Sequence, residues 1–340
     1  MWLTSSSIGR KFVMALTGCC LVLFLTFHVL MNSVALIWPT AYNQICALLG
    51  ANWYALIASM GLAALFIIHI IYAIWLTIQN RAARGTDRYA VTARQPQVEW
   101  SSKNMLVLGF VVVAFIAVHM IQFWSKMQLV EALHTDIANL PQVDGVPAGP
   151  ALGSLFLQAA FKEIWTPIIY VLAFVALWFH MNHGFWSMLH TVGWNNNIWM
   201  NRLKTIGCWW TTIVVGLFII QVGVFSYQAH QNYYLENEAL QEQYAEFWVE
   251  QANATLEDWQ EAATKFQASA EGAENMEELQ SEFLSDNIPS YLARTQVIIN
   301  GAKTHCSKIA MPAEIKQLEQ FSGWLNMMNP NKGSVTESNE

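Results

Sequence analysis

The sequence predicts an all-α membrane protein, in which a bundle of five transmembrane helices is followed by an acidic, helical, soluble C-terminal tail. Three observations support this fold class. The chain of 340 residues is 54% hydrophobic and only 12% charged, and this charged share is about half that of soluble domains. Its first part contains five apolar runs long enough to cross a bilayer. Finally, its charge is divided unevenly between the two parts.

The five apolar runs define a membrane domain over residues 1–230. Each run has about the 20 residues that an α-helix needs to cross the hydrocarbon core. The first begins after Arg10 and Lys11 and is not followed by a small-residue cleavage site, so we expect it to be retained rather than removed as a signal peptide. The predicted spans lie near residues 12–36, 53–79, 104–125, 164–188 and 206–228.

Residues 231–340 form the acidic extension. This segment contains 18 Asp and Glu against 6 Lys and Arg, a net charge of −12, which leaves +5 for residues 1–230. Between Tyr233 and Gln267 the apolar residues recur with a helical period. Breaks near residues 271–275 and at Pro289 and Pro312 predict three or four further short helices, and residues 329–340 are expected to be disordered. We expect the tail either to stabilise the outer loops or to dock an additional partner or a second copy.

The basic residues of the membrane domain predict its orientation. Nine of the eleven lie before the first span, after the second or after the fourth, and such clusters mark the cytoplasmic side. The N-terminus is therefore expected inside, and five spans place the acidic tail outside. The nine residues are Arg10, Lys11, Arg81, Arg84, Arg88, Arg94, Lys103, Arg202 and Lys204.

Composition also excludes several classes of protein. The net charge of −7 offers no basic surface for nucleic acid. The five cysteines contain no C-x-x-C pair and no C-x-x-C-H motif, so a disulfide scaffold, a structural zinc and a covalently attached haem are poorly supported.

Each of the first four spans contains one deep histidine, namely His28, His69, His119 and His180. A polar group at such depth is costly and indicates a functional site with a partner inside the bundle; a hydrogen bond to a neighbouring helix is the alternative for any single one. Counted from the span starts, all four lie about 25 Å along their helices. Because neighbouring spans run in opposite directions, His28 and His119 share an outer level, and His69 and His180 share an inner level.

Two facing neutral imidazoles without a nearby carboxylate or thiolate suit an iron porphyrin better than a hard cation. A b-type haem takes one axial nitrogen from each side and, with both positions filled, moves electrons rather than binding oxygen. The two levels therefore predict two haem b groups. Four glycines in the spans either admit a macrocycle or allow close helix packing. They are Gly18, Gly61, Gly109 and Gly216.

Over residues 1–230 the chain resembles the five-helix, two-haem cytochrome b subunit of succinate dehydrogenases and fumarate reductases. The order and spacing of several short motifs carry this resemblance. The motifs are S-S-S-I-G-R-K-F-V-M-A-L-T-G from Ser5, F-H at Phe27, I-H-I-I-Y around His69, N-R-A-A-R-G-T-D-R-Y from Asn80, V-H-M around His119 and F-H-M-N-H-G-F-W-S from Phe179.

The resemblance implies a non-catalytic membrane anchor of a succinate:quinone oxidoreductase in a bacterial cytoplasmic membrane, with its tail in the periplasm. His28 and His119 take the role of ligands to the distal haem iron, and His69 and His180 that of ligands to the proximal haem iron. The implied partners are a flavoprotein subunit with FAD and an iron–sulfur subunit, both on the cytoplasmic face, together with membrane lipid and a quinone, expected to be menaquinone. No catalytic residue is expected in this chain.

Further residues are candidates for contacts with haem propionates or quinone. His183 lies one turn after His180 and is also the alternative ligand to it. The basic and hydroxyl candidates near the inner end either hold propionates or anchor the chain at anionic headgroups; they are Arg10, Lys11, Ser6, Ser7 and Lys103. The chain departs from some relatives in having no acidic residue from Ala41 to Trp53 and a tryptophan at Trp178, where those relatives have glutamate.

Two other functions remain open from the sequence. One is a haem b anchor of another quinone-linked enzyme, of the hydrogenase or formate dehydrogenase type, whose histidines are often placed far apart within shared helices. The other is a non-redox transporter, which would be expected to have Asp or Glu within its spans and an internal repeat. The five predicted spans contain neither.

Overall fold

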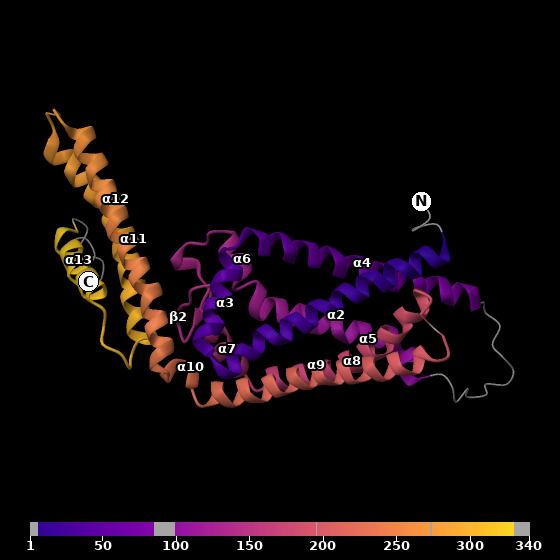
Figure 1. Ribbon diagram of the computed structural model, residues 1–340. Coiled ribbons are helices and arrows are strands. Elements are labelled where there is room, and N and C mark those ends of the chain that lie inside the picture. The colour runs from indigo at the N-terminus through magenta and orange to yellow at the C-terminus, as the bar shows by residue number, and fades with distance from the viewer. Residues whose placement is uncertain (1–5, 85–98, 195, 273, 330–340) are drawn as a thin grey trace, which may run out of the picture.

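The computed structural model describes residues 6–84, 99–194, 196–272 and 274–329. Five long helices lie side by side, and a helical arm projects from one end of them (Figure 1). We call this the tail end; α2 begins at the opposite end. The long helices are α2 (Ser7–Ile37), α4 (Trp53–Arg84), α5 (Trp100–His119), α8 (Trp165–Thr191) and α9 (Trp199–His230).

The five predicted spans are confirmed as helices that are long and apolar enough to cross a membrane. The third consists of α5 and a π-helical turn, η1 (Met120–Trp124), which continues it. The shortest has 25 residues, which at 1.5 Å per residue reach about 38 Å and exceed the roughly 30 Å of a hydrocarbon core. The protein is therefore a multi-pass, all-α membrane protein.

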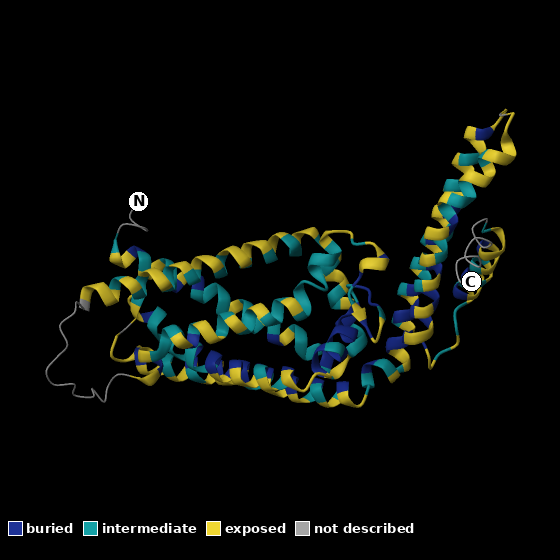
Figure 2. Ribbon diagram, turned by 180° about the vertical axis from the view of Figure 1, so that it is seen from behind, coloured by how far each residue is buried: buried dark blue, intermediate teal, exposed yellow. Residues whose placement is uncertain are grey.

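Burial differs greatly between these helices. α8 and α9 contribute many buried residues, whereas α4 has none from Trp53 to Ala83 and lies along the edge of the bundle (Figure 2). Its exposed side chains are large and apolar, for example Ile67, Ile71 and Ile78. A helix that is apolar on its exposed faces is suited to lipid.

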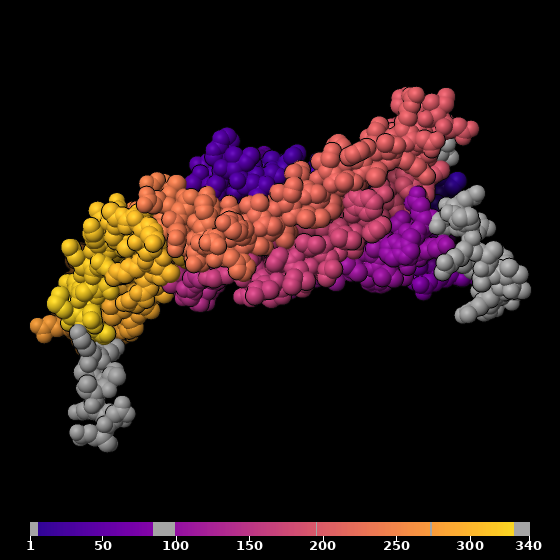
Figure 3. Space-filling model, turned by 90° about the horizontal axis from the view of Figure 1, so that it is seen from below, coloured from indigo at the N-terminus to yellow at the C-terminus, as the bar shows by residue number. Residues whose placement is uncertain are grey.

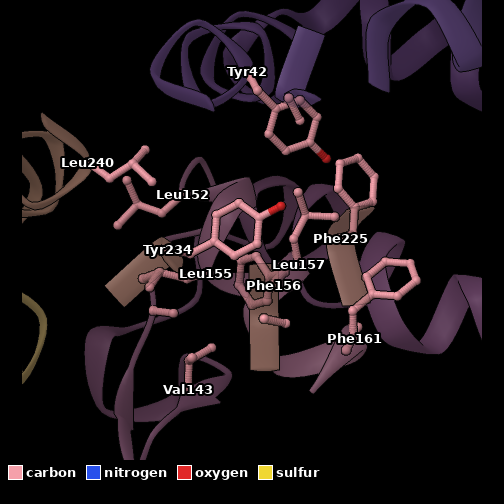
Figure 4. Close-up of a cluster of buried hydrophobic side chains, with 14 of the residues drawn as sticks. Tyr42, Val143, Leu152, Leu155, Phe156, Leu157, Phe161, Phe225, Tyr234 and Leu240 are labelled. Atoms are coloured by element: carbon pink, nitrogen blue, oxygen red, sulfur yellow. The ribbon is translucent and has the colours of Figure 1, made fainter. Parts of the chain in front are cut away.

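Short elements close the tail end of the bundle. They are α3 (Pro39–Ala51), α6 (Gln128–Ala132), the 3-10 turn η2 (Ile137–Asn139), β1 (Gln142–Val143), β2 (Val146–Pro147) and α7 (Gly153–Phe161). The strands pair antiparallel, with Val143 opposite Val146, around a turn whose residues Asp144 and Gly145 both have positive φ, as a tight type I′ hairpin requires. α7 is buried on nearly all sides. Figure 4 shows how its side chains meet others from α3, α9 and the tail.

The tail is helical, as predicted, but its helices are longer than expected. It comprises α10 (Tyr233–Glu236), α11 (Glu238–Ala270), α12 (Met276–His305) and α13 (Ala313–Met328). The helical structure of the tail is interrupted after Ala270 and again before α13, where Pro312 is the N-cap. The predicted break at Pro289 is wrong, because α12 continues through it. The Pro289 ring lies on the exposed face while its neighbour Ile288 is fully buried, so packing outweighs the lost backbone hydrogen bond. Residues 330–340, where disorder was predicted, lie outside the described residues.

The tail docks on the closing elements of its own chain and covers one end of the elongated molecule (Figure 3). Gln243 of α11 accepts a hydrogen bond from Asn43 Nδ2 at 3.0 Å and donates to the Thr40 carbonyl at 3.1 Å. The Tyr244 hydroxyl lies 2.8 Å from Ser154 Oγ of α7. Trp248 is fully buried, and a Cβ atom on Gly301 of α12 would overlap its indole ring. The closing elements and the tail helices therefore supply the partners that the tail aromatics need.

Candidate cofactor-binding site

A large cavity runs through the bundle beside α2, α4, α5 and α8. Its volume is about 2320 Å³, well above the roughly 300–1,000 Å³ of a site for one small ligand. The four deep histidines line it, and so does His183. Among the described lining residues, histidines aside, only Lys11 and Glu131 carry a formal charge. The cavity therefore suits a large, mostly apolar group that imidazoles can hold.

His28 of α2 and His119 of α5 face each other at the level nearer the tail. Their ring centroids are 5.8 Å apart, and the rings are nearly perpendicular. Phe24 stacks against His28, and Phe115 stacks against His119. The Nδ1 atom of His119 lies 3.1 Å from the Tyr170 hydroxyl. This contact leaves Nε2 as the nitrogen available to a metal ion.

Tyr170 belongs to a short hydrogen-bond chain behind His119. Its hydroxyl donates to Gln122 Oε1 at 2.8 Å, and Gln122 Nε2 donates to Thr166 Oγ1 at 3.1 Å. Gln122 lies within the π-helical turn that follows His119. Such turns are frequent at functional sites. A ligating histidine usually donates from its second nitrogen to a partner of this kind, which fixes the tautomer and the ring orientation.

His69 of α4 and His180 of α8 form the second pair, with ring centroids 6.4 Å apart. The Nδ1 atom of His69 lies 3.1 Å from Thr17 Oγ1. His180 Nδ1 is buried without a hydrogen-bond partner among the described residues. Two glycines, Gly18 and Gly109, lie against these rings: a Cβ on either would be 3.5–3.7 Å from an imidazole carbon.

The four predicted histidines thus lie in the predicted pairs. A metal–imidazole nitrogen bond is about 2.0 Å long and the ring centre lies about 1 Å further, so one ion between two imidazoles separates their centroids by about 6 Å. Both observed separations are close to this value. One contact has to change, because His28 Nε2 is 3.3 Å from Asn32 Nδ2. If His28 Nε2 gives up this contact with the Asn32 amide and binds a metal ion instead, the residues fit a haem at each level.

The four glycines singled out from the sequence lie in different surroundings, and their place beside a macrocycle stays a prediction. Gly18 and Gly109 lie against His69 and His180, and Gly61 lines the cavity with nothing within 4 Å of a Cβ built there. Gly216 also has open space around it but does not line the cavity.

The candidate propionate donors lie in different surroundings. Arg10 stacks over Trp75 at 5.2 Å, and its Nη1 donates to the Gln79 amide oxygen at 2.8 Å when that amide is oriented to accept. Its Nε is buried without a partner among the described residues, which suits a neighbouring anion. Lys11 lines the cavity itself.

The other three candidates have less direct positions. The Ser6 hydroxyl caps α2 by accepting from the Gly9 backbone N–H at 2.9 Å. Ser7 and Lys103 are exposed, in the first turns of α2 and α5. Neither of them lines the cavity.

His183 has an acidic partner of its own. Its Nδ1 lies 3.5 Å from Glu99 Oε2, and Trp186 Nε1 donates to the same oxygen at 3.2 Å. His183 pairs with no second imidazole among the described residues, whereas His180 faces His69. The geometry therefore favours His180 over His183 as the partner of His69.

Sequence reasoning missed the residues that orient the histidines and the element that closes the cavity. Thr17 and Tyr170 are polar residues inside apolar spans, and that position was the available signal. α3 had no such signal, because its sequence reads as an uncharged loop. It contributes Cys46 to the cavity wall, where burial raises the pKa of the thiol to about 12.

The fold and the site together define a multi-pass helical membrane protein whose bundle encloses an imidazole-lined cavity. Comparison of the chain with protein-family models, with curated proteins and with solved structures finds no match.

Proposed function

We propose that this protein is the membrane-anchor subunit of a succinate:quinone oxidoreductase and holds two b-type haems. One observation carries the proposal. Two pairs of imidazoles lie at two levels of the same bundle, and the spacing within each pair suits a single metal ion. When bound, bis-histidine haems supply one-electron transfer across the membrane between the soluble redox subunits and a quinone.

The residues of this chain have distinct tasks under this proposal. His28 and His119 hold the group nearer the tail, and His69 and His180 hold the other. Tyr170 and Thr17 orient one imidazole of each pair through Nδ1. The apolar wall excludes water, and Arg10 and Lys11 offset the charge of propionates.

The motif resemblance supports the remaining parts of the proposal. It places a flavoprotein subunit with FAD and an iron–sulfur subunit on the cytoplasmic face, at the end where α2 begins, and menaquinone in the membrane. The bacterial cytoplasmic membrane, the inside N-terminus and the periplasmic tail follow from the same source and from the basic clusters. The absence of Asp and Glu from the described spans disfavours a proton-coupled transporter.

Purification tests the proposal directly. The full chain is isolated from its native membrane in mild detergent, and a reduced-minus-oxidised spectrum and a subunit gel are recorded. We expect two b-type components and two co-purifying subunits, the larger with covalently bound flavin. The His230→Ala variant, altered at an exposed histidine outside the cavity, is the matched control and should retain both components. A preparation without a haem spectrum would refute the proposal.

A further inference from the structure

The tail meets the closing elements of the bundle along a contact that includes the end of α12. The hairpin of β1 and β2 packs against α12 (Figure 1), and a Cβ atom on Gly149, just after β2, would lie only 2.8 Å from the Phe247 ring of α11. His305, the last residue of α12, and its neighbour Cys306 are 0% and 1% exposed. Cys306 belongs to the same hydrophobic core as Val143 of β1. We call the contact between the hairpin and the end of α12 the tail seam.

Three polar atoms in the tail seam are buried without hydrogen-bond partners among the described residues. Two are the ring nitrogens of His305, and the third is Nε1 of Trp248, whose ring centre lies 5.9 Å from that of His305. Native proteins leave few buried polar atoms unpaired, so each of them requires an explanation. Burial disfavours the charged form of an imidazole that has no partner. The docked tail therefore holds His305 in its neutral form.

The groups on the tail helices do not offset a positive charge on His305. On α11, the Tyr244 ring lies 6.0 Å from the imidazole, and burial raises the pKa of its hydroxyl. Burial also raises the pKa of the Cys306 thiol, so both groups remain neutral. Lys303, on the same helix as His305, forms an ion pair with Glu319 of α13 at 2.6 Å.

The closing elements offer His305 only weak compensation. Burial lowers the pKa of His305 from 6.5 to about 4, and the Val143 backbone and the Asp144 carboxylate oppose this shift only in part. The Asp144 side chain is 35% exposed and lies 4.0 Å from the Lys162 ammonium. On η2, the carboxylate of Asp136 accepts a hydrogen bond from its own turn, at the Ala138 N–H. Proton uptake by His305 therefore opposes docking of the tail.

The direction of the pH effect follows from the two pKa values. When the tail seam opens, His305 enters water and regains a pKa near 6.5, whereas the docked form binds a proton only near pH 4. The open form therefore binds the proton more tightly. The stabilisation of the docked form is complete above about pH 6.5 and is lost as the pH falls towards about 4.

We propose that His305 makes the docking of the tail pH-sensitive, so that uptake of a proton by its imidazole opens the tail seam. The proton comes from the aqueous phase at the tail end and binds one ring nitrogen. With the tail outside, as proposed above, the seam responds to the acidity of the outer compartment. The inference concerns the tail and the closing elements alone, so it holds whether or not the bundle binds haem.

The accessibility of Cys306 measures the opening of the tail seam. The full chain in its native membrane is treated with a dipyridyl disulfide, which reacts with thiols at acid pH, and modification is followed by peptide mass spectrometry. The rate is divided by that of an introduced Ser281→Cys, at an exposed position on α12. Because buried Cys306 reacts only when the seam is open, we expect the normalised rate to rise roughly 70-fold from about pH 7.5 to about pH 4.5.

Three kinds of variant identify the cause of this rise. His305→Leu and His305→Phe should each abolish it, because neither side chain binds a proton. His230→Leu, altered at an exposed histidine outside the tail seam, is the matched control and should retain it. Thr295→Cys reports on the inside of the tail, because Thr295 is fully buried and its hydroxyl lies 3.1 Å from Ser322 Oγ of α13. This position should stay protected over the same pH range.

Three results would overturn the proposal. One is a normalised Cys306 rate that does not change with pH. Another is an equal rise in both His305 variants, which would assign the effect to a different group. The third is an equal rise at Thr295→Cys, which would mean that acid unfolds the tail as a whole instead of opening the tail seam.

Discussion

Replacing Tyr170 by phenylalanine removes one hydroxyl from the chain behind His119 and leaves the ring in place. That hydroxyl donates to Gln122, so its oxygen accepts from the His119 Nδ1 hydrogen. The ring is buried and makes edge contacts with Phe115, Phe161 and Phe174, so phenylalanine fits the same space. The variant should therefore fold and keep both haems.

The expected effect is on the reduction potential of the outer haem. A hydrogen bond from Nδ1 raises the basicity of a ligating imidazole and so stabilises oxidised iron. Its loss should therefore raise the potential. A hydrogen bond contributes about 0.5–1.5 kcal/mol, and about 59 mV corresponds to a tenfold change for a one-electron couple. The potential should rise by roughly 20–60 mV.

Redox titration of the reduced haem bands provides the assay, with Thr17→Val as the matched comparison. Thr17 donates to the Val13 carbonyl and lies 3.1 Å from His69 Nδ1, so its replacement should raise the potential of the inner component instead. Each variant should move one component and leave the other unchanged. Equal shifts of both components, or a shift of the wrong one, would refute the assigned orientation of the imidazoles.

Four further outcomes are expected. Alanine in place of any one of His28, His69, His119 and His180 should remove one spectral component, whereas His183→Ala should keep both; loss of a component in His183→Ala would reverse the ligand choice. An impermeant thiol reagent should label an introduced Ser281→Cys on intact spheroplasts but not the buried Cys306, and protection of position 281 would reverse the topology. Trp248→Ala should destabilise the tail by about 3–5 kcal/mol in thermal unfolding without loss of haem; loss of haem would make the tail part of the haem site. Burial lowers the pKa of His305 from 6.5 to about 4, so the unfolded state binds the extra proton and stability should fall by up to about 3 kcal/mol as pH drops through that window; an equal fall in His305→Leu would exclude this cause.

The membrane spans and the histidine pairs could be predicted because both depend on regular geometry. An apolar run of bilayer length has one stable form in lipid, and a constant rise per residue converts sequence distance into depth. His28 and His119 could therefore be paired without knowledge of the helix positions. The role of these residues as haem ligands remains a prediction.

Contacts that depend on side-chain packing could not be predicted. Pro289 indicates a helix break by local rules, but the buried neighbour Ile288 keeps α12 continuous. The sequence of α3 has no charge and no clear hydrophobic period, and the helix is kept in position by close contact with α7. A Cβ on Gly153 of α7 would lie only 2.6 Å from Cys46 Sγ of α3. Nothing local in the sequence indicates that these segments meet.

The docking of the tail has a consequence for biosynthesis. Gln243 bonds residues about 200 positions earlier in the chain, in α3, and Tyr244 bonds α7, about 90 positions earlier. The tail is synthesised after α3 and α7, and its binding surface exists only when both are correctly placed between inserted spans. A chain with a span missing or inverted cannot form the Tyr244 contact with α7 or the Gln243 contacts with α3, and so leaves the docking face of α11 uncovered. Correct insertion of the spans that hold α3 and α7 is therefore a condition for docking of the tail.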